Sequence, residues 1–215
     1  FISVRTMATI PAAVINAVVI PQLVLKSPPW PAYPARYNLK VLSVEYETLD
    51  PLLGPTKASG VICVPLGMSQ ARPDLMSYQH GTVLQREHAP SGGGLEIDRD
   101  YVLAIASSLG YVVALPDYLG LGPGSTGLHP FGHRRSSATA TVDLLRATRT
   151  LMATDPDLML DVPLGLSNKL FLKGYSEGGF VTLAAQREIE EKHSAEFTIT
   201  ASAPSEGPYD LDRKS

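Results

Sequence analysis

The sequence predicts an α/β protein with a mostly parallel sheet. Apolar strand-like runs at 111–115 and 169–173 alternate with segments of helical spacing at 100–109 and 136–152. This alternation is typical of parallel strands covered by helices on both faces of a sheet. The chain of 215 residues is 44% hydrophobic and 18% charged, which is ordinary for one globular domain with a sizeable core.

A hairpin is expected to precede the parallel strands. Residues 38–46 alternate in polarity and 57–65 form a second strand-like run, with the turn dipeptides Asp50-Pro51 and Gly54-Pro55 between them. Such a pattern predicts an antiparallel pair at one edge of the sheet. The other expected elements are a strand at 75–78, a helix from just after 176 to about 192, and a last strand at 197–203.

The N-terminal segment 1–36 is predicted to be separate from the core of 37–215. Prolines crowd 26–36, an extended connector, and the apolar stretch 10–25 predicts a short helix packed on the domain. That stretch is interrupted by prolines and is shorter than the roughly 20 residues of a transmembrane helix. It also lacks the charged start of a signal peptide, so neither a membrane span nor a signal peptide is expected.

Charge and cysteine content exclude some function classes. The net charge of -3 gives no basic surface for nucleic acid. Cys63 is the single cysteine and lies within an apolar run, so we expect a buried strand residue and neither a disulfide nor a catalytic thiol. No metal site is expected.

The strongest motif is Gly174-Tyr175-Ser176-Glu177-Gly178. It matches G-x-S-x-G, the sharp strand-to-helix turn that presents a nucleophilic serine, and the expected strand and helix flank it here. Side chains at the glycine positions would collide with neighbouring backbone. We therefore predict Ser176 as the nucleophile, with Tyr175 beside it at the pocket.

Two backbone amides are expected to form an oxyanion hole. The N–H of Glu177 lies at the start of the helix, where the helix dipole adds to its effect. The second donor is predicted to be the N–H of Thr82, with Gly81 allowing close approach. His80 is expected to pack and hydrogen-bond under this loop, in a supporting role.

A second loop is expected at the carboxyl ends of the strands, where open α/β sheets bind ligands. Asp117 and Tyr118 begin this loop. Asp117 is either part of a pocket or, the interpretation we favour, a turn aspartate bonded to local backbone. His129 and His133 are expected near the same edge, and either could line the pocket.

The chain offers no obvious acid and base for Ser176. A serine nucleophile needs a histidine oriented by an acid, in the order Ser, Asp or Glu, His. His193 is the sole later histidine and would lie about 25 Å away along the helix. Glu188, Glu190 and Glu191 are expected on a solvated helix face, and Asp210 and Asp212 have no later histidine to act on. We therefore expect that the sheet is truncated before its last strands and that the chain alone has little activity.

Several segments together resemble the secretory lipase family of α/β-hydrolases, including its bacterial secreted members. They occur in the family's order at 77–82, 116–122, 128–130, 174–179, 201–204 and 207–211. The resemblance implies the α/β-hydrolase fold and hydrolysis of carboxylic or lipid esters by a Ser-Asp-His triad. It also implies no cofactor, export from the cell, and a cap inserted after the strand that ends near Ala203. Glu177 departs from the family, because relatives often have an uncharged residue such as glutamine there, and its carboxylate would oppose an oxyanion unless paired.

Two alternatives stay open. A serine peptidase or an acyltransferase of the same fold would use the same turn and the same acyl-enzyme. A non-catalytic hydrolase-like fragment would retain the fold without an acid and a base.

Overall fold

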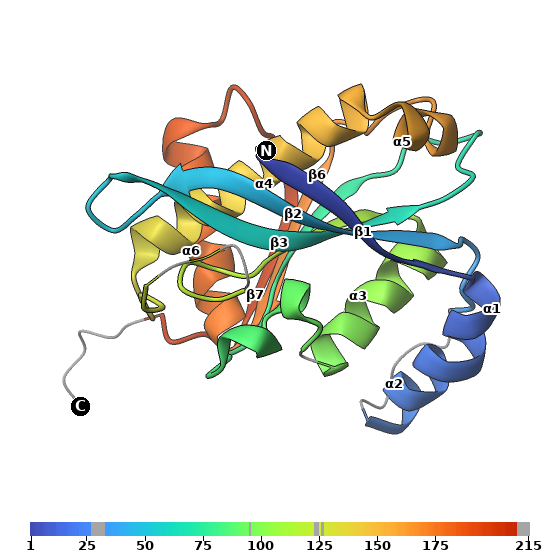
Figure 1. Cartoon of the computed structure of the whole chain (residues 1–215), viewed down its shortest axis with the longest axis horizontal. Helices are drawn as coiled ribbons and strands as arrows, with labels where there is room; N and C mark the ends of the chain where they lie inside the picture. Colours follow the sequence, from blue (N-terminus) through green and yellow to red (C-terminus); the bar gives the residue numbers. More distant parts are fainter. Residues whose placement is uncertain (27–32, 95, 123–124, 126, 210–215) are drawn as a thin grey trace.

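A seven-stranded mixed sheet runs through the part of the molecule that the structure describes (Figure 1). The structure is a computed structural model, and it describes residues 1–26, 33–94, 96–122, 125 and 127–209. The strands lie in the order β1-β2-β3-β5-β4-β6-β7. Their bounds are β1 Ser3–Ile10, β2 Leu39–Leu49, β3 Pro55–Pro65, β4 Leu75–Gln79, β5 Val112–Pro116, β6 Leu170–Tyr175 and β7 Ile199–Ser205.

Strand directions confirm the predicted class. The pairs β1–β2, β2–β3 and β3–β5 are antiparallel, whereas β5, β4, β6 and β7 are parallel to one another. The β2–β3 hairpin is continuous from Leu39 opposite Pro65 to Leu49 opposite Pro55. Asp50 closes its turn, because Oδ1 accepts hydrogen bonds from the N–H groups of Leu52 and Gly54, both at 2.8 Å.

Helices cover both faces of the sheet, as Figure 1 shows. The N-terminal helices and α3 lie against one face, where buried Ile15, Leu23 and Ile105 meet Val113. The helices α4, α5 and α6 lie against the other, where Leu144, Leu158 and Ile189 contribute to the core. The bounds are α1 Ala12–Val14, η1 Ile15–Val19 (a π-helix), α2 Ile20–Lys26, η2 Arg86–His88, η3 Pro90–Gly92, α3 Glu96–Leu109, α4 Arg134–Thr154, α5 Pro156–Asp161 and α6 Glu177–Lys192.

The first strand is a correction to the sequence analysis. Segment 1–36 was expected to hold a helix and a connector, and the short helix packed on the domain is present. Residues Ser3–Ile10, however, form β1, which pairs with β2 at the edge of the same sheet. Most β1 side chains are exposed, so the segment lacks the clean alternation by which a half-buried strand is recognised.

The burial of Cys63 agrees with the sequence analysis, whereas that of Glu188 does not. Cys63 is buried on β3, as predicted, and burial raises the pKa of its thiol to about 12. Glu188 was expected on a solvated face but is buried, with its carboxylate 2.8 Å from Lys192 Nζ, one helical turn further along. Helical periodicity alone could not reveal this, because α4 covers the face of α6 that carries Glu188.

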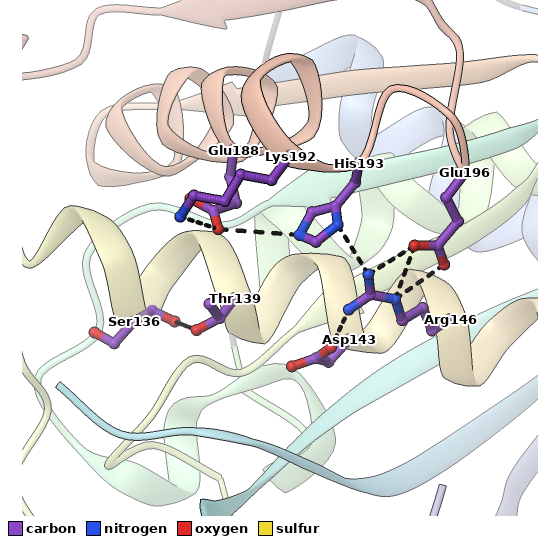
Figure 2. A network of polar contacts seen from close by, with 8 residues as sticks. All are labelled: Ser136, Thr139, Asp143, Arg146, Glu188, Lys192, His193 and Glu196. Atoms are coloured by element: carbon purple, nitrogen blue, oxygen red, sulfur yellow. Dashed lines mark hydrogen bonds and ion pairs between the residues drawn. The ribbon is translucent and has the colours of Figure 1, made fainter. Parts of the chain in front are cut away.

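Glu188 belongs to a polar network between α4 and the C-terminal end of α6, shown in Figure 2. Arg146 on α4 donates to Glu196 at 2.6 Å, to Asp143 at 2.9 Å and to Nδ1 of His193 at 3.1 Å. His193 Nε2 lies 4.0 Å from Glu188 Oε1. The network links α4 to the end of α6, after which the chain leads into β7.

No helix in the described ranges combines the length and apolar character needed to cross a bilayer.

Candidate active site

Ser176 lies at a strained turn between β6 and α6. Its φ of 58° and ψ of −124° belong to a backbone conformation that residues with a side chain rarely adopt. Such a conformation costs on the order of 1–3 kcal/mol and persists only where the surroundings enforce it. The Ser176 N–H donates to the carbonyl of Ser205 at 3.0 Å, so the end of β7 helps to hold the turn.

Three glycines let the turn close against its neighbours. A Cβ on Gly174 would collide with the carbonyl oxygen of Gly178, and a Cβ on Gly178 would collide with that of Gln79 at the end of β4. A Cβ on Gly179 would collide with the carbonyl oxygen of Ser205. The steric reason expected for the G-x-S-x-G spacing is therefore present in the backbone.

The Ser176 side chain is partly exposed and makes no hydrogen bond that caps α6. All five histidines are among the described residues, and none hydrogen-bonds to it. His133 caps α4 through Nδ1, which accepts from the Ser136 N–H at 3.3 Å, and His193 ends α6. Asp210 and Asp212 lie outside the described residues.

The loop after β4 lies beside the turn. A Cβ on Gly81 would be 3.8 Å from the carbonyl oxygen of Tyr175. The Gly81 N–H itself donates to Asp98 at 3.2 Å, so it is not free to bind an oxyanion. Thr82 is exposed and lines a pocket of about 610 Å³ together with Val83, Leu84, Gln85, His88, Gly93 and Gly94. Tyr175 is also exposed, and its role in a pocket stays a prediction.

His80 is buried under this loop, in the position of a supporting residue. Its Nδ1 lies 2.6 Å from the Gly81 carbonyl oxygen, and its Nε2 lies 3.2 Å from that of Asp117. Its ring stacks on Tyr118 with 4.1 Å between centroids, and the Tyr118 hydroxyl donates back to the His80 carbonyl at 3.0 Å. These contacts join the loops that follow β4 and β5.

Asp117 makes long-range contacts, which corrects the favoured expectation of local backbone bonding. Its carboxylate accepts from Ser59 Oγ on β3 at 2.5 Å and from the N–H of Ser91 at 2.8 Å, and the Ser91 hydroxyl also donates to it. Burial raises the pKa of Asp117, and the hydrogen bonds from Ser59 and Ser91 offset part of that effect. A Cβ on Gly122 would overlap this carboxylate, so the glycine-rich loop closes directly over it. Asp117 therefore links strand β3, the segment after β4 and its own loop after β5.

His129 contacts the residue that follows the nucleophile. Its Nε2 lies 2.7 Å from Glu177 Oε1, and its Nδ1 lies 2.8 Å from the Leu119 carbonyl oxygen. Burial lowers the pKa of His129, but the hydrogen bonds to Glu177 and Leu119 and the charge of Glu177 outweigh it, so the pKa is raised. The carboxylate that could oppose an oxyanion is thus paired.

The described residues contain no cluster of three or more His, Cys, Asp or Glu side chains that could hold a metal ion.

Comparison with solved structures places this fold among known hydrolases. A Legionella pneumophila protein named as a candidate hydrolase is 28% identical, with a TM-score of 0.84 over 96% of this chain and 52% of that one. The rice cell wall degrading esterase LipA from Xanthomonas oryzae is 32% identical, with a TM-score of 0.78 over 98% of this chain and 50% of that one. Lipase A of Candida antarctica is 20% identical and shares the fold, with a TM-score of 0.61 over 94% of this chain and 41% of that one.

The chain has the α/β-hydrolase fold and is similar to lipase- and esterase-like proteins of that fold. It spans about half the length of the solved structures that it matches. No protein-family model and no curated protein sequence matches it.

Within this α/β-hydrolase fold, the sequence predicted the turn but not the pairs around it. The Glu177–His129 contact joins residues 48 positions apart, and Asp117 and Ser59 are 58 apart. One signal was present for the first pair: an acidic residue directly after the nucleophile, where it requires a compensating partner.

Proposed function

We propose that Ser176 is the nucleophile of a carboxylic-ester hydrolase. Its hydroxyl oxygen attacks the ester carbonyl carbon, the alcohol leaves, and water then hydrolyses the acyl-enzyme to release the acid. The single observation that carries this proposal is the strained, partly exposed Ser176 between β6 and α6, enforced by glycines on both sides.

The oxyanion formed at each step would be held by two backbone amides. The Glu177 N–H lies in the first turn of α6, and we assign the second donor to Thr82, on the loop beside the turn. Donors placed before the reaction stabilise developing charge without the cost of reorganisation. Gly81 serves by its small size, since its N–H is bonded to Asp98.

The acid and the base are assigned to residues outside the described part of the chain. The histidines support this assignment, because none of the five hydrogen-bonds to Ser176 in the described residues: His80 is buried against two carbonyl oxygens, His129 is paired with Glu177, and His133 caps α4. His193 ends α6, and His88 lies in the pocket of Thr82 without a bond to the serine. Without a base at Ser176, the 215-residue chain alone is expected to hydrolyse esters at a small fraction of the rate of the complete gene product.

We assign small acyl or lipid esters as substrates, with no cofactor. The comparison with an esterase and a lipase supports this class. We also propose export to the cell exterior or periplasm, which the family resemblance implies and a cell wall degrading neighbour supports.

The test is hydrolysis of p-nitrophenyl esters of increasing acyl length by the protein expressed from the complete gene. Ser176→Ala is expected to reduce kcat by at least about 10³-fold. Ser202→Ala, a serine on the neighbouring strand β7, is the control and should retain activity. Undiminished turnover in Ser176→Ala would contradict the proposal.

The same assay separates the alternatives. Cleavage of matched anilides as fast as esters indicates a peptidase, and transfer of the acyl group to an added alcohol in preference to water indicates an acyltransferase. An absence of turnover on all these substrates indicates a non-catalytic hydrolase-like protein.

A further inference from the structure

The side chain of Glu177 is a buried acid directly beside the proposed nucleophile. It is 2% exposed, and one of its oxygens, Oε2, is buried with no hydrogen-bond partner among the described residues. The other oxygen, Oε1, has one, Nε2 of His129 at 2.7 Å. A carboxylate removed from water with so little hydrogen bonding depends strongly on that single partner.

The hydrogen bonds of His129 define its protonation. A carbonyl oxygen only accepts, so Nδ1, 2.8 Å from the Leu119 carbonyl oxygen, carries a hydrogen. Nε2 must also carry a hydrogen in order to donate to an ionised Glu177. With Glu177 ionised, both ring nitrogens are protonated and the pair is an imidazolium with a carboxylate, whereas a protonated Glu177 donating to Nε2 would make a neutral pair of the same geometry. The raised pKa of His129 favours the charged form.

Aromatic rings surround the His129 ring. Tyr118, from the loop after β5, stacks on the His129 ring at 6.0 Å, and Phe131 meets it edge-on at 6.1 Å. Burial, and then the charges of Glu177 and Asp98 from α3, raise the pKa of Tyr118, so its hydroxyl stays neutral. His80, the residue directly after β4, stacks on Tyr118, and both of its ring nitrogens face carbonyl oxygens.

A tight turn in the loop after β5 places His129 next to Glu177. Gly120 has a φ of 76°, and a Cβ there would collide with the His129 backbone N–H. The Leu119 carbonyl oxygen and the His129 ring are thereby held together, and the ring reaches α6. One side chain therefore ties the loop after β5 to the first residue of α6.

We propose that His129, as an imidazolium, is a positioning residue of the nucleophile turn. It neutralises the carboxylate of Glu177 beside the oxyanion site and fixes the residue whose backbone N–H is assigned as an oxyanion donor. The proposal rests on the proposed function for its catalytic consequence, whereas the charged pair itself is measurable without turnover.

The first test is NMR detection of the histidine ring nitrogens in 15N-labelled protein across a pH titration. The isosteric variant Glu177→Gln removes the carboxylate charge while keeping its shape. His129 is expected to be doubly protonated at neutral pH in the wild type and to titrate at lower pH in Glu177→Gln, whereas His88 and His133 keep their midpoints. A neutral His129 at pH 7 in the wild type, or an unchanged midpoint in the variant, overturns the proposal.

The second test is a double-mutant cycle on kcat in the complete gene product. His129→Gln is expected to lower kcat by about tenfold to a hundredfold with little change in KM, because the donor beside Ser176 moves while substrate binding is retained. In the Glu177→Gln background, the same change should cost less than about threefold, since no buried charge is left unpaired. Equal losses in the two backgrounds would contradict the assigned role. His129→Asn is the second variant if His129→Gln does not fold.

The two proposals fail in different ways. Turnover that survives Ser176→Ala removes the proposed function, and the NMR titration then decides the His129–Glu177 pair alone. Additive kinetics together with a Ser176-dependent reaction remove the positioning role and leave the function standing.

Discussion

The two ends of α6 each bury a glutamate, but they stabilise it in different ways. At the N-terminal end, Glu177 is 2% exposed and depends on His129, which comes from a loop 48 residues earlier. At the C-terminal end, Glu188 is 4% exposed and is paired with Lys192 on the same helix, within the network of Figure 2. The Lys192 side chain is half exposed, so water shares in solvating that pair.

The N-terminal end of α6 has a strained backbone that distant segments hold in place. The C-terminal end is stabilised by residues of the same helix and of its neighbour α4. Beside Glu177 the backbone of Ser176 is held in a costly conformation, and the partners that hold it lie on β4, β7 and the loop after β5. Near Glu188 the backbone has an ordinary helical conformation. Several ion pairs stabilise this end of α6 together. The proposed catalytic serine lies at the N-terminal end of α6, where the Glu177 carboxylate has a single hydrogen-bond partner among the described residues.

The largest effect is expected from Gly178→Ala at the N-terminal end. The added Cβ would collide with the carbonyl oxygen of Gln79 and press on that of His80, so α6 must move away from β4. We expect a loss of more than about 4 kcal/mol in the free energy of unfolding, measured by urea denaturation. Gly67→Ala is the control: its φ of 77° is strained for alanine, but nothing lies within 4 Å, so it should cost about 1 kcal/mol. Similar losses for both variants would refute the steric explanation.

The next effect is expected from His129→Ala. It leaves the Glu177 carboxylate buried without its hydrogen-bond partner, which is expected to cost about 3 kcal/mol of unfolding free energy. Adding Glu177→Gln should recover most of that loss in thermal or urea unfolding. A double variant as unstable as the sum of the two single variants would show that the charges do not interact.

Arg146→Ala tests the C-terminal end and is expected to cost less, about 1 kcal/mol, because the Arg146 side chain is 39% exposed and water replaces much of its bonding. Arg187→Ala, which removes an exposed pair with Glu191, is the control and should leave the unfolding midpoint unchanged. If Arg146→Ala were as damaging as His129→Ala, the contrast between the two ends would be wrong.

The smallest effect is a pH dependence specific to the N-terminal end. The raised pKa of folded His129 means that its contribution to stability is complete below about pH 6.5, the value for the unfolded chain, and is lost as the pH rises through the folded value. The unfolding free energy of the wild type minus that of Glu177→Gln should therefore fall with rising pH, by at most about 1.4 kcal/mol per pH unit. A difference that stays constant from roughly pH 6 to 9 would argue against the charged pair.

The sequence could predict what is local or periodic. The parallel strands, the hairpin and the turn at Ser176 each follow from local polarity patterns and from turn residues. The strand β1 could not be predicted, because its side chains are mostly exposed and its partner residues on β2 lie 29 to 42 positions away. The roles of Asp117, Glu177 and His129 depend on distant partners, which the loops after β4 and β5 bring together only in the fold.

The account depends most on Ser176 being the nucleophile. The direct measurement is mass-spectrometric mapping of the adduct formed by a fluorophosphonate, which bonds covalently to activated serines, with the complete gene product. We expect one adduct on the peptide that contains Ser176, absent in Ser176→Ala and weaker in His129→Gln. An adduct on another residue, or ester hydrolysis that continues with Ser176 unmodified, would contradict the account.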